Sequence, residues 1–322
     1  MTGGRSGRPL AALGASLLSL GIGAPSLTAQ PGDDAYRIVT SDLENFWRAW
    51  DRAATAETWD DSVAAFEALY REQGSEGLAD FFGSRIEDVP TLLREIRSAP
   101  RYYAALRPQT PRVQEFVPEI HRMFADWLEL YPEADLPDVF FVIGRRTSGG
   151  TTSAGRLLIG TEMYGRTPDT PDEELSDWQR DVLAPIDRIP AIVAHELIHT
   201  QQRATRPQTL LGRVIQEGMC DFLGELISGL NINAHVHEWA DARAAELWAD
   251  FREVMGERET NAGWLYGARS EDEPADLGYW LGYRITEAYY EKAGDRGAAI
   301  REILTIQDYE AFLEASAYDG GG

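Results

Sequence analysis

The amino-acid sequence predicts a mainly helical α+β fold that contains a small β-sheet. Apolar residues recur every three or four positions over most of the 322-residue chain, which is the spacing of amphipathic helices. Two short apolar runs, 139–143 and 157–160, interrupt this spacing and predict strands. The segment 189–202 is apolar nearly all round yet holds charged side chains, which predicts a buried helix with a chemical role.

The first 29 residues have the plan of a cleavable secretory signal. Arg5 and Arg8 precede an apolar stretch at 10–22, and a small-residue site ends at Ala29. We expect cleavage between Ala29 and Gln30 and an exported mature chain, either periplasmic or secreted. No later segment has the roughly 18 consecutive apolar residues that a membrane helix needs, so no membrane span is expected after cleavage.

Residues 30–135 predict a helical N-terminal lobe. Phe46, Trp47 and Trp50 recur at helical spacing, and Pro111 is placed like a first-turn residue of a helix that runs to residue 130. We expect this lobe to act as a scaffold for a second region, 136–322, which carries the chemistry.

That second region begins with a predicted strand pair. The strands at 139–143 and 157–160 are separated by a polar stretch at 145–155 that is rich in Gly, Ser and Thr, which predicts a long loop. An exposed edge of this pair could add an extended substrate as a further strand, with the loop as a flap. An ordinary surface hairpin fits the same residues equally well.

The predicted buried helix contains the pattern His195-Glu196-x-x-His199. Residues four apart lie on one helical face, so both imidazoles can bind one metal ion while Glu196 serves as the catalytic base. The alternative is a chance pattern of satisfied core histidines. Because the chain has only five histidines, and because a cation would compensate the burial of these groups, the sequence favours a catalytic Zn²⁺ site.

A catalytic zinc needs a third protein ligand. The continuation with Gly at 202 and His at 205 is excluded, since Gln202 and Thr205 stand there. A following helix carries Glu217 and, one turn later, Asp221, so we expect Glu217 to bind the metal and Asp221 to accept the N–H of a ligating histidine. The alternatives are Asp221 as the ligand, or a solvated acidic stripe.

Hydrolysis also needs a donor for the developing oxyanion. Tyr279 and Tyr283, four residues apart, are candidates, although tyrosines at helical spacing are often core aromatics. His235 and His237 are rival donors, and they are also alternative metal ligands.

Composition limits the remaining choices. The formal charge of −23 argues against nucleic-acid binding, which depends on Lys and Arg contacts to phosphates. The excess of acid is expected to solvate the surface and to favour cationic or neutral substrates. Cys220 is the single cysteine, so neither an intrachain disulfide nor a cysteine zinc site is expected.

The pattern H-E-x-x-H followed by E-G-x-x-D resembles that of the gluzincin peptidases. The stretches FFVIGRRTSGGTTSAGRLLIGTEMYG, VAHELIHTQQ, VIQEGMCDFLGELISG and LGYWLGYRITEAYY are similar to those of exported bacterial proteins described as predicted zinc-dependent proteases, which are related to the gliding-motility GldB-type lipoproteins. This resemblance implies a zincin-like fold and peptidase activity. The chain lacks an anchoring cysteine after the predicted signal, which departs from the lipoprotein relatives.

The function expected from the sequence is hydrolysis of peptide bonds by a zinc-activated water, with Glu196 as general base and a peptide or protein as substrate. Two alternatives remain: an envelope assembly or binding protein that keeps the scaffold without proteolysis, and a zinc hydrolase of a non-peptide amide. The intact Glu196 favours an enzyme, because neither folding nor metal ligation requires that base.

Overall fold

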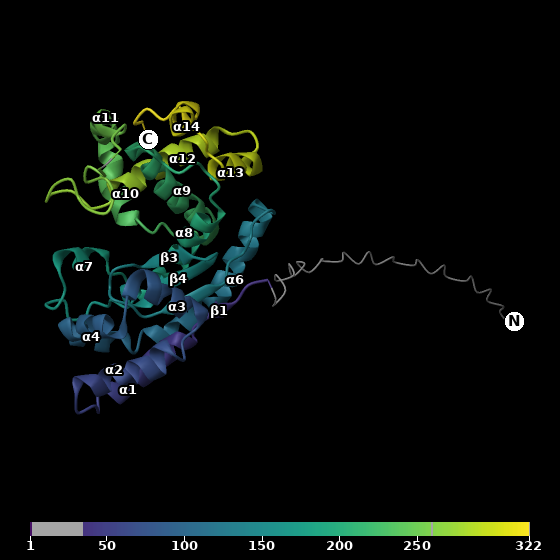
Figure 1. The fold of residues 1–322 in the computed structure, drawn as a ribbon. Helices are drawn as coiled ribbons and strands as arrows, with labels where there is room; N and C mark the ends of the chain where they lie inside the picture. The colour runs from purple at the N-terminus through teal and green to yellow at the C-terminus, as the bar shows by residue number, and fades with distance from the viewer. Residues whose placement is uncertain (2–34, 259, 322) are drawn as a thin grey trace.

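A computed structural model describes Met1 and residues 35–258 and 260–321 of the chain (Figure 1). The predicted mainly helical α+β architecture with a small sheet is confirmed. The predicted signal segment and its cleavage site at Ala29/Gln30 lie outside the described residues. Among the described helices, none is both long and apolar enough to cross a membrane.

The N-terminal part is mainly helical, with one short strand that the sequence did not predict. Its elements are β1 (Ile38–Val39), α1 (Ser41–Ala53), α2 (Trp59–Phe66), α3 (Glu76–Phe81), α4 (Val89–Ser98), α5 (Pro100–Leu106) and α6 (Val113–Leu130). Phe46 and Trp47 of α1 are buried, as their spacing predicts. Pro111 lies in a 3-10 turn just before α6 rather than in its first turn.

Four strands form one sheet in the order β1-β2-β4-β3. The predicted strands appear as β2 (Val139–Val142) and β4 (Arg156–Gly160), which pair in parallel with each other. The long loop predicted at 145–155 is wrong, because it contains β3 (Gly150–Ser153), which pairs antiparallel with β4. Ala154 and Gly155 both have positive φ, as a tight two-residue hairpin turn requires. An edge strand needs no apolar side chains, and the residues of β3 are polar. The sequence of β3 therefore lacks the apolar pattern that predicts a strand.

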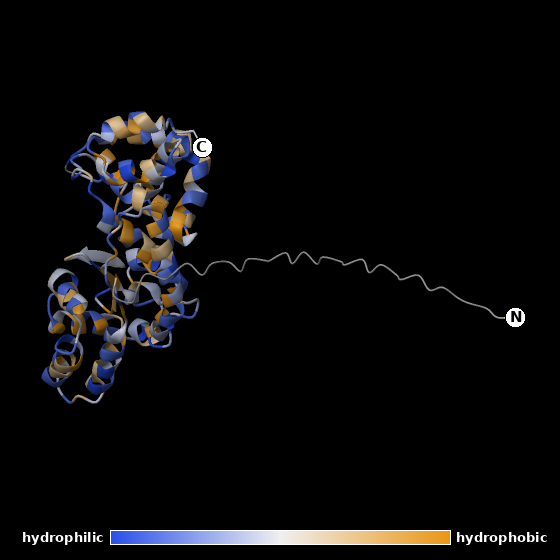
Figure 2. Ribbon diagram, turned by 90° about the vertical axis from the view of Figure 1, so that its right-hand side faces the viewer, coloured by the Kyte–Doolittle hydropathy of each residue, from blue (hydrophilic) through white to orange (hydrophobic). Residues whose placement is uncertain are grey.

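The C-terminal part is helical. Its elements are α7 (Asp177–Val182), α8 (Ile189–Gln201), α9 (Leu210–Ser228), α10 (Ala234–Ala240), α11 (Ala244–Val254), α12 (Leu277–Lys292), α13 (Arg296–Leu304) and α14 (Tyr309–Ser316). Helices α9 to α14 gather at one end of the molecule, with α8 between them and the sheet (Figure 1). Hydrophobic and hydrophilic residues alternate along the helices of both ends, as expected of amphipathic helices around a core (Figure 2).

Two close helix contacts bring functional residues together. Helices α9 and α12 cross at Gly218 and Gly282, where a Cβ on Gly282 would lie 1.9 Å from the carbonyl oxygen of Val214. Helices α8 and α9 meet near Gly224, where a Cβ would lie 3.2 Å from the backbone nitrogen of His195. Larger side chains would separate these helices, so the glycines set how near α9 lies to both neighbours.

Candidate metal centre

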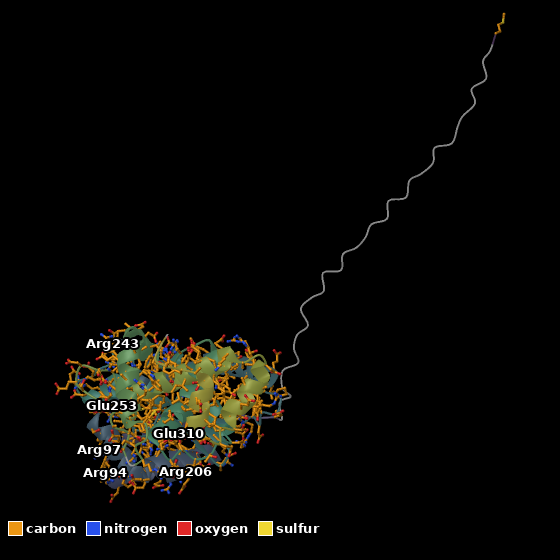
Figure 3. The ribbon with its side chains drawn as sticks, turned by 90° about the horizontal axis from the view of Figure 1, so that it is seen from above. Arg94, Arg97, Arg206, Arg243, Glu253 and Glu310 are labelled. Atoms are coloured by element: carbon orange, nitrogen blue, oxygen red, sulfur yellow. The ribbon has the colours of Figure 1, made fainter. Side chains whose placement is uncertain are left out.

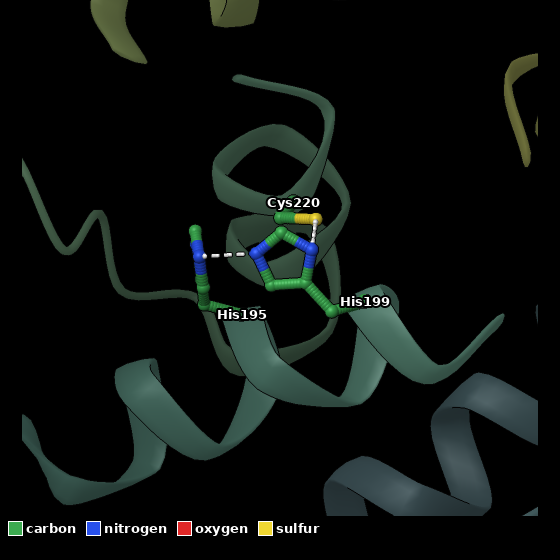
Figure 4. A group of neighbouring side chains, drawn as sticks. All are labelled: His195, His199 and Cys220. Atoms are coloured by element: carbon green, nitrogen blue, oxygen red, sulfur yellow. Dashed lines mark hydrogen bonds between the residues drawn. The ribbon is translucent and has the colours of Figure 1, made fainter. Parts of the chain in front are cut away.

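Helix α8 places the two predicted histidine ligands on one face. His195 and Glu196 are 6% and 7% exposed, and the Nε2 atoms of His195 and His199 lie 3.1 Å apart (Figure 4). Two imidazole nitrogens at this distance, one on the buried His195 and one on the partly buried His199, share one small volume. That volume is where a cation would compensate their burial.

Helix α9 brings Glu217 to the same point. Its Oε2 lies 3.3 Å from His199 Nε2 and 3.7 Å from His195 Nε2. Ligand atoms bound 2.0–2.1 Å from a tetrahedral zinc are spaced about 3.3–3.4 Å apart, so the three donors have the separations such an ion requires. The residues present therefore fit zinc, with two neutral imidazoles and one carboxylate as its protein ligands.

Asp221 lies on the opposite side of the His195 ring. Its Oδ1 is 2.7 Å from His195 Nδ1, and its Oδ2 accepts a hydrogen bond from Asn233 Nδ2 at 2.7 Å. A carboxylate bonded to Nδ1 holds the imidazole with its Nε2 free to bind a metal. The geometry therefore favours Glu217 over Asp221 as the ligand, and it gives Asp221 the orienting contact expected of it.

Cys220 lies beside His199, which the sequence did not lead us to expect. Its Sγ is 3.4 Å from His199 Nδ1 (Figure 4), and it also accepts a hydrogen bond from Gln202 Nε2. Because Cys220 contacts the Nδ1 edge of the ring, it is turned away from the Nε2 pair. Burial raises the pKa of the Cys220 thiol well above its ordinary value, which disfavours the thiolate that a metal needs. Gln202, whose Oε1 is 3.2 Å from His199 Nδ1, supplies the second orienting contact.

The charges of the site compensate one another in the absence of a metal. Burial acts to raise the pKa of Glu217, but bonds to His195 and His199 outweigh it and lower that pKa. Burial likewise opposes protonation of the two imidazoles, but their carboxylate neighbours raise the pKa of each. Burial raises the pKa of Glu196. Metal binding would therefore replace protons on the histidines.

Strand β3 passes directly beside Glu196. A Cβ on Gly150 would lie 2.5 Å from Glu196 Oε1, so any larger residue at this position would displace the carboxylate. Gly160 N donates to Gly149 O at 3.0 Å. Because hydrogen bonding alternates along an antiparallel pair, the backbone groups of Gly150 and Thr152 point away from β4, toward the free edge of the described sheet.

The predicted tyrosines have different surroundings. The ring of Tyr279 lies 6.1 Å from that of His195, so Tyr279 adjoins the site. The ring of Tyr283 packs 4.6 Å from His237 and 5.3 Å from Phe222, one turn farther along α12. His235 is exposed, and His237 is taken up by this aromatic contact, so neither is among the three converging donors.

Tyr266 is the neighbour of the site that sequence reasoning missed. Its hydroxyl donates to Glu217 Oε1 at 2.9 Å, although the residue is 64% exposed. It lies on the long segment between α11 and α12, where Asp276 Oδ1 accepts the backbone N–H groups of Tyr266 and Gly267. No periodicity or motif marks a tyrosine that is 49 positions from its partner. Asn233 was missed for the same reason.

Comparison with known proteins identifies the family. No curated protein and no solved structure matches the chain. The model of the family described as gliding motility protein GldB matches residues 42–320, a span that includes every side chain of the site and all described helices except for the first residue of α1. Since this match covers most of the chain, the chain belongs to the gliding motility protein GldB family.

Proposed function

We propose that this protein is an exported zinc-dependent metallopeptidase. The observation that carries the proposal is the convergence of His195 Nε2, His199 Nε2 and Glu217 Oε2 within 3.7 Å, with Glu196 beside them under an edge strand. A buried structural site would need no free carboxylate. Once Glu217 of α9 binds the metal, Glu196 of α8 is still available for proton transfer.

The three converging side chains would hold the ion and Glu196 would move the protons. Zinc, when bound there, supplies a Lewis acid that makes water more acidic and polarises a carbonyl group. Glu196 accepts the proton of the attacking water and returns it to the leaving amine. Its burial, which raises its pKa, brings its proton affinity closer to that needed for this double role near neutral pH.

The free edge of β3 would position an extended peptide. Gly150 and Thr152 offer outward backbone groups to a substrate strand, and the Gly150 position sets that strand next to Glu196. Residues 150–153, within the stretch 145–155 for which the sequence suggested a flap, form this strand. A backbone template of this kind fits an amide-containing chain of several residues better than a small isolated amide.

Tyr266 is the best-placed donor for the oxyanion. Its hydroxyl already lies at the third ligand, Glu217, and its exposure leaves it room to turn toward a substrate. Tyr279 adjoins His195 and is the second candidate. Tyr283 faces Phe222 and His237, so we assign it to the packing between α9 and α12.

Family membership supports one alternative from another class. The family's description names gliding motility and no proteolytic activity, which favours an envelope protein that uses this fold for assembly or binding. Export to the cell envelope is common to both functions. The two functions differ in their need for Glu196, because a binding protein does not require a catalytic base.

The test is zinc content of the mature chain by elemental mass spectrometry, together with cleavage of a mixed peptide library. We expect one zinc per chain, cleavage by the wild type, and retained zinc without cleavage in Glu196→Gln. Glu238→Gln, the same acid-to-amide change at an exposed position of α10, is the matched control and should cleave normally. Zinc without cleavage would favour the assembly protein, and absence of zinc would refute the metal centre.

A further inference from the structure

A pocket of about 720 Å³ opens next to the candidate metal centre. Glu217 and Tyr266 belong to its wall, so the pocket begins at the third metal ligand. The rest of the wall includes three arginines, Arg206, Arg213 and Arg258.

This concentration of positive charge is unusual for the chain. The protein has a net charge of −23, yet Glu217 is the only acidic residue among the described residues that line the pocket. Glu217 is already engaged by the two histidines and by Tyr266. Within the described part of the chain, no carboxylate forms a salt bridge with any of the three arginines. In the rest of that part, most ion pairs join an arginine to an Asp or Glu side chain.

Arg213 is fixed in place without being neutralised. Its guanidinium donates to Asn261 Oδ1 at 3.0 Å, to the carbonyl oxygen of Arg258 at 3.2 Å and to that of Thr260 at 2.6 Å. These acceptors are neutral, so they orient the guanidinium, and none of the described carboxylates pairs with its charge. Three neighbouring cations repel one another, and an anion bound among them relieves that repulsion.

We propose that this pocket is a substrate subsite that binds a carboxylate of the peptide. The proposal rests on the proposed function and adds the substrate class to it. Guanidinium groups bind carboxylates through paired, charge-assisted hydrogen bonds, which gives both affinity and orientation. The overall charge of the protein predicts a preference for cationic or neutral substrates. At this subsite the arginines favour an anionic group instead.

The carboxylate has two sources in a peptide. One is the α-carboxylate of the C-terminus, which would make the enzyme an exopeptidase that acts near that end. The other is the side chain of an Asp or Glu residue close to the cleaved bond. Both present the same group to the same arginines, so the experiment has to separate them.

The experiment is isothermal titration of the zinc-loaded mature Glu196→Gln protein with four versions of one peptide. They combine a C-terminal acid or amide with an internal Glu or Gln. We expect the versions that carry the recognised carboxylate to bind roughly tenfold more tightly, the effect of a charged hydrogen bond. A preference for the C-terminal acid identifies the α-carboxylate, and a preference for the internal Glu identifies the side chain.

The double variant Arg206→Gln/Arg258→Gln should abolish this preference and leave the fully neutral peptide bound as before. Both arginines are exposed and neither donates a side-chain hydrogen bond to a described residue, so the fold should tolerate the change. Arg94→Gln/Arg97→Gln, two exposed arginines of α4 that Figure 3 labels together with Arg206, is the matched control for charge. Equal affinity for all four peptides, or a preference that survives the double variant, would overturn the subsite.

This binding assay separates the two proposals. Peptide binding that depends on the arginines supports the subsite even if the wild type cleaves nothing. Cleavage by the wild type without any carboxylate preference supports the peptidase and refutes the subsite.

Discussion

His195 Nδ1 lies 2.7 Å from Asp221 Oδ1, and the other oxygen of Asp221 is held by Asn233 at the same distance. Both oxygens of this buried carboxylate are therefore engaged. The chain Asn233–Asp221–His195 fixes the imidazole so that its Nε2 faces Glu217. An orienting carboxylate of this kind also makes the imidazole a stronger metal ligand.

We expect Asp221→Asn to weaken zinc binding about 10–100-fold, the range typical of lost orienting contacts to a ligating histidine. The amide keeps the shape of the side chain but gives up the charge that holds the His195 tautomer. Competition for zinc with a chromogenic chelator measures the effect. Glu225→Gln, one turn along α9, is the control that should bind zinc like the wild type. Unchanged affinity in Asp221→Asn would show that His195 does not bind zinc in this orientation.

The identity of the third ligand can be tested by comparing Glu217→Gln with Cys220→Ser. The thiol lies at the Nδ1 edge of His199, whereas Glu217 faces the Nε2 atoms of both histidines. Glu217→Gln should therefore lose zinc at chelator concentrations at which Cys220→Ser retains it. The opposite order would place the ion between His199 and Cys220.

Tyr266→Phe should lower kcat while leaving KM and zinc content nearly unchanged. If its hydroxyl stabilises the oxyanion, its removal costs roughly 100-fold in kcat, as for other oxyanion donors. The control is Tyr283→Phe, which removes a hydroxyl from α12 away from the three donors and should leave turnover unaffected. Equal turnover in wild type and Tyr266→Phe would transfer the role to Tyr279.

The sequence was sufficient to predict the parts of the site that depend on helical spacing. His195, Glu196 and His199 are three residues of one helix, and the apolar residues around Glu217 and Asp221 marked a second buried helix. The remaining parts depend on which segments meet in space. Tyr266 and the three arginines lie on loops or helix starts without periodicity, and β3 is an edge strand whose polar residues resemble a loop.

Another buried carboxylate, Glu162, lies in the segment after β4. It is fully buried, and its Oε1 accepts the backbone N–H of Arg146 at 3.1 Å, while its Oε2 has no hydrogen-bond partner among the described residues. Burial raises the pKa of Glu162 from its ordinary 4.5 to about 7, against the lowering effect of backbone hydrogen bonds from Gly144 and Arg146. The folded protein therefore keeps this group protonated under conditions in which the unfolded chain has ionised it.

Glu162→Gln should make the free energy of unfolding less dependent on pH. Because the folded pKa is the higher one, the stabilisation from Glu162 is complete below pH 4.5 and is lost as the pH rises to about 7. At about 1.4 kcal/mol per pKa unit, the wild type should lose about 3 kcal/mol over this window through Glu162. The amide cannot ionise, so the variant should not show this loss. The unfolding free energy of the variant minus that of the wild type should therefore increase by that amount as the pH rises through this window. Urea unfolding with chelator present, at pH 4.5, 6 and 8, measures it. The exposed Glu238→Gln is the control, and parallel curves for Glu162→Gln and wild type would mean that Glu162 has the same pKa in the folded protein as in the unfolded chain.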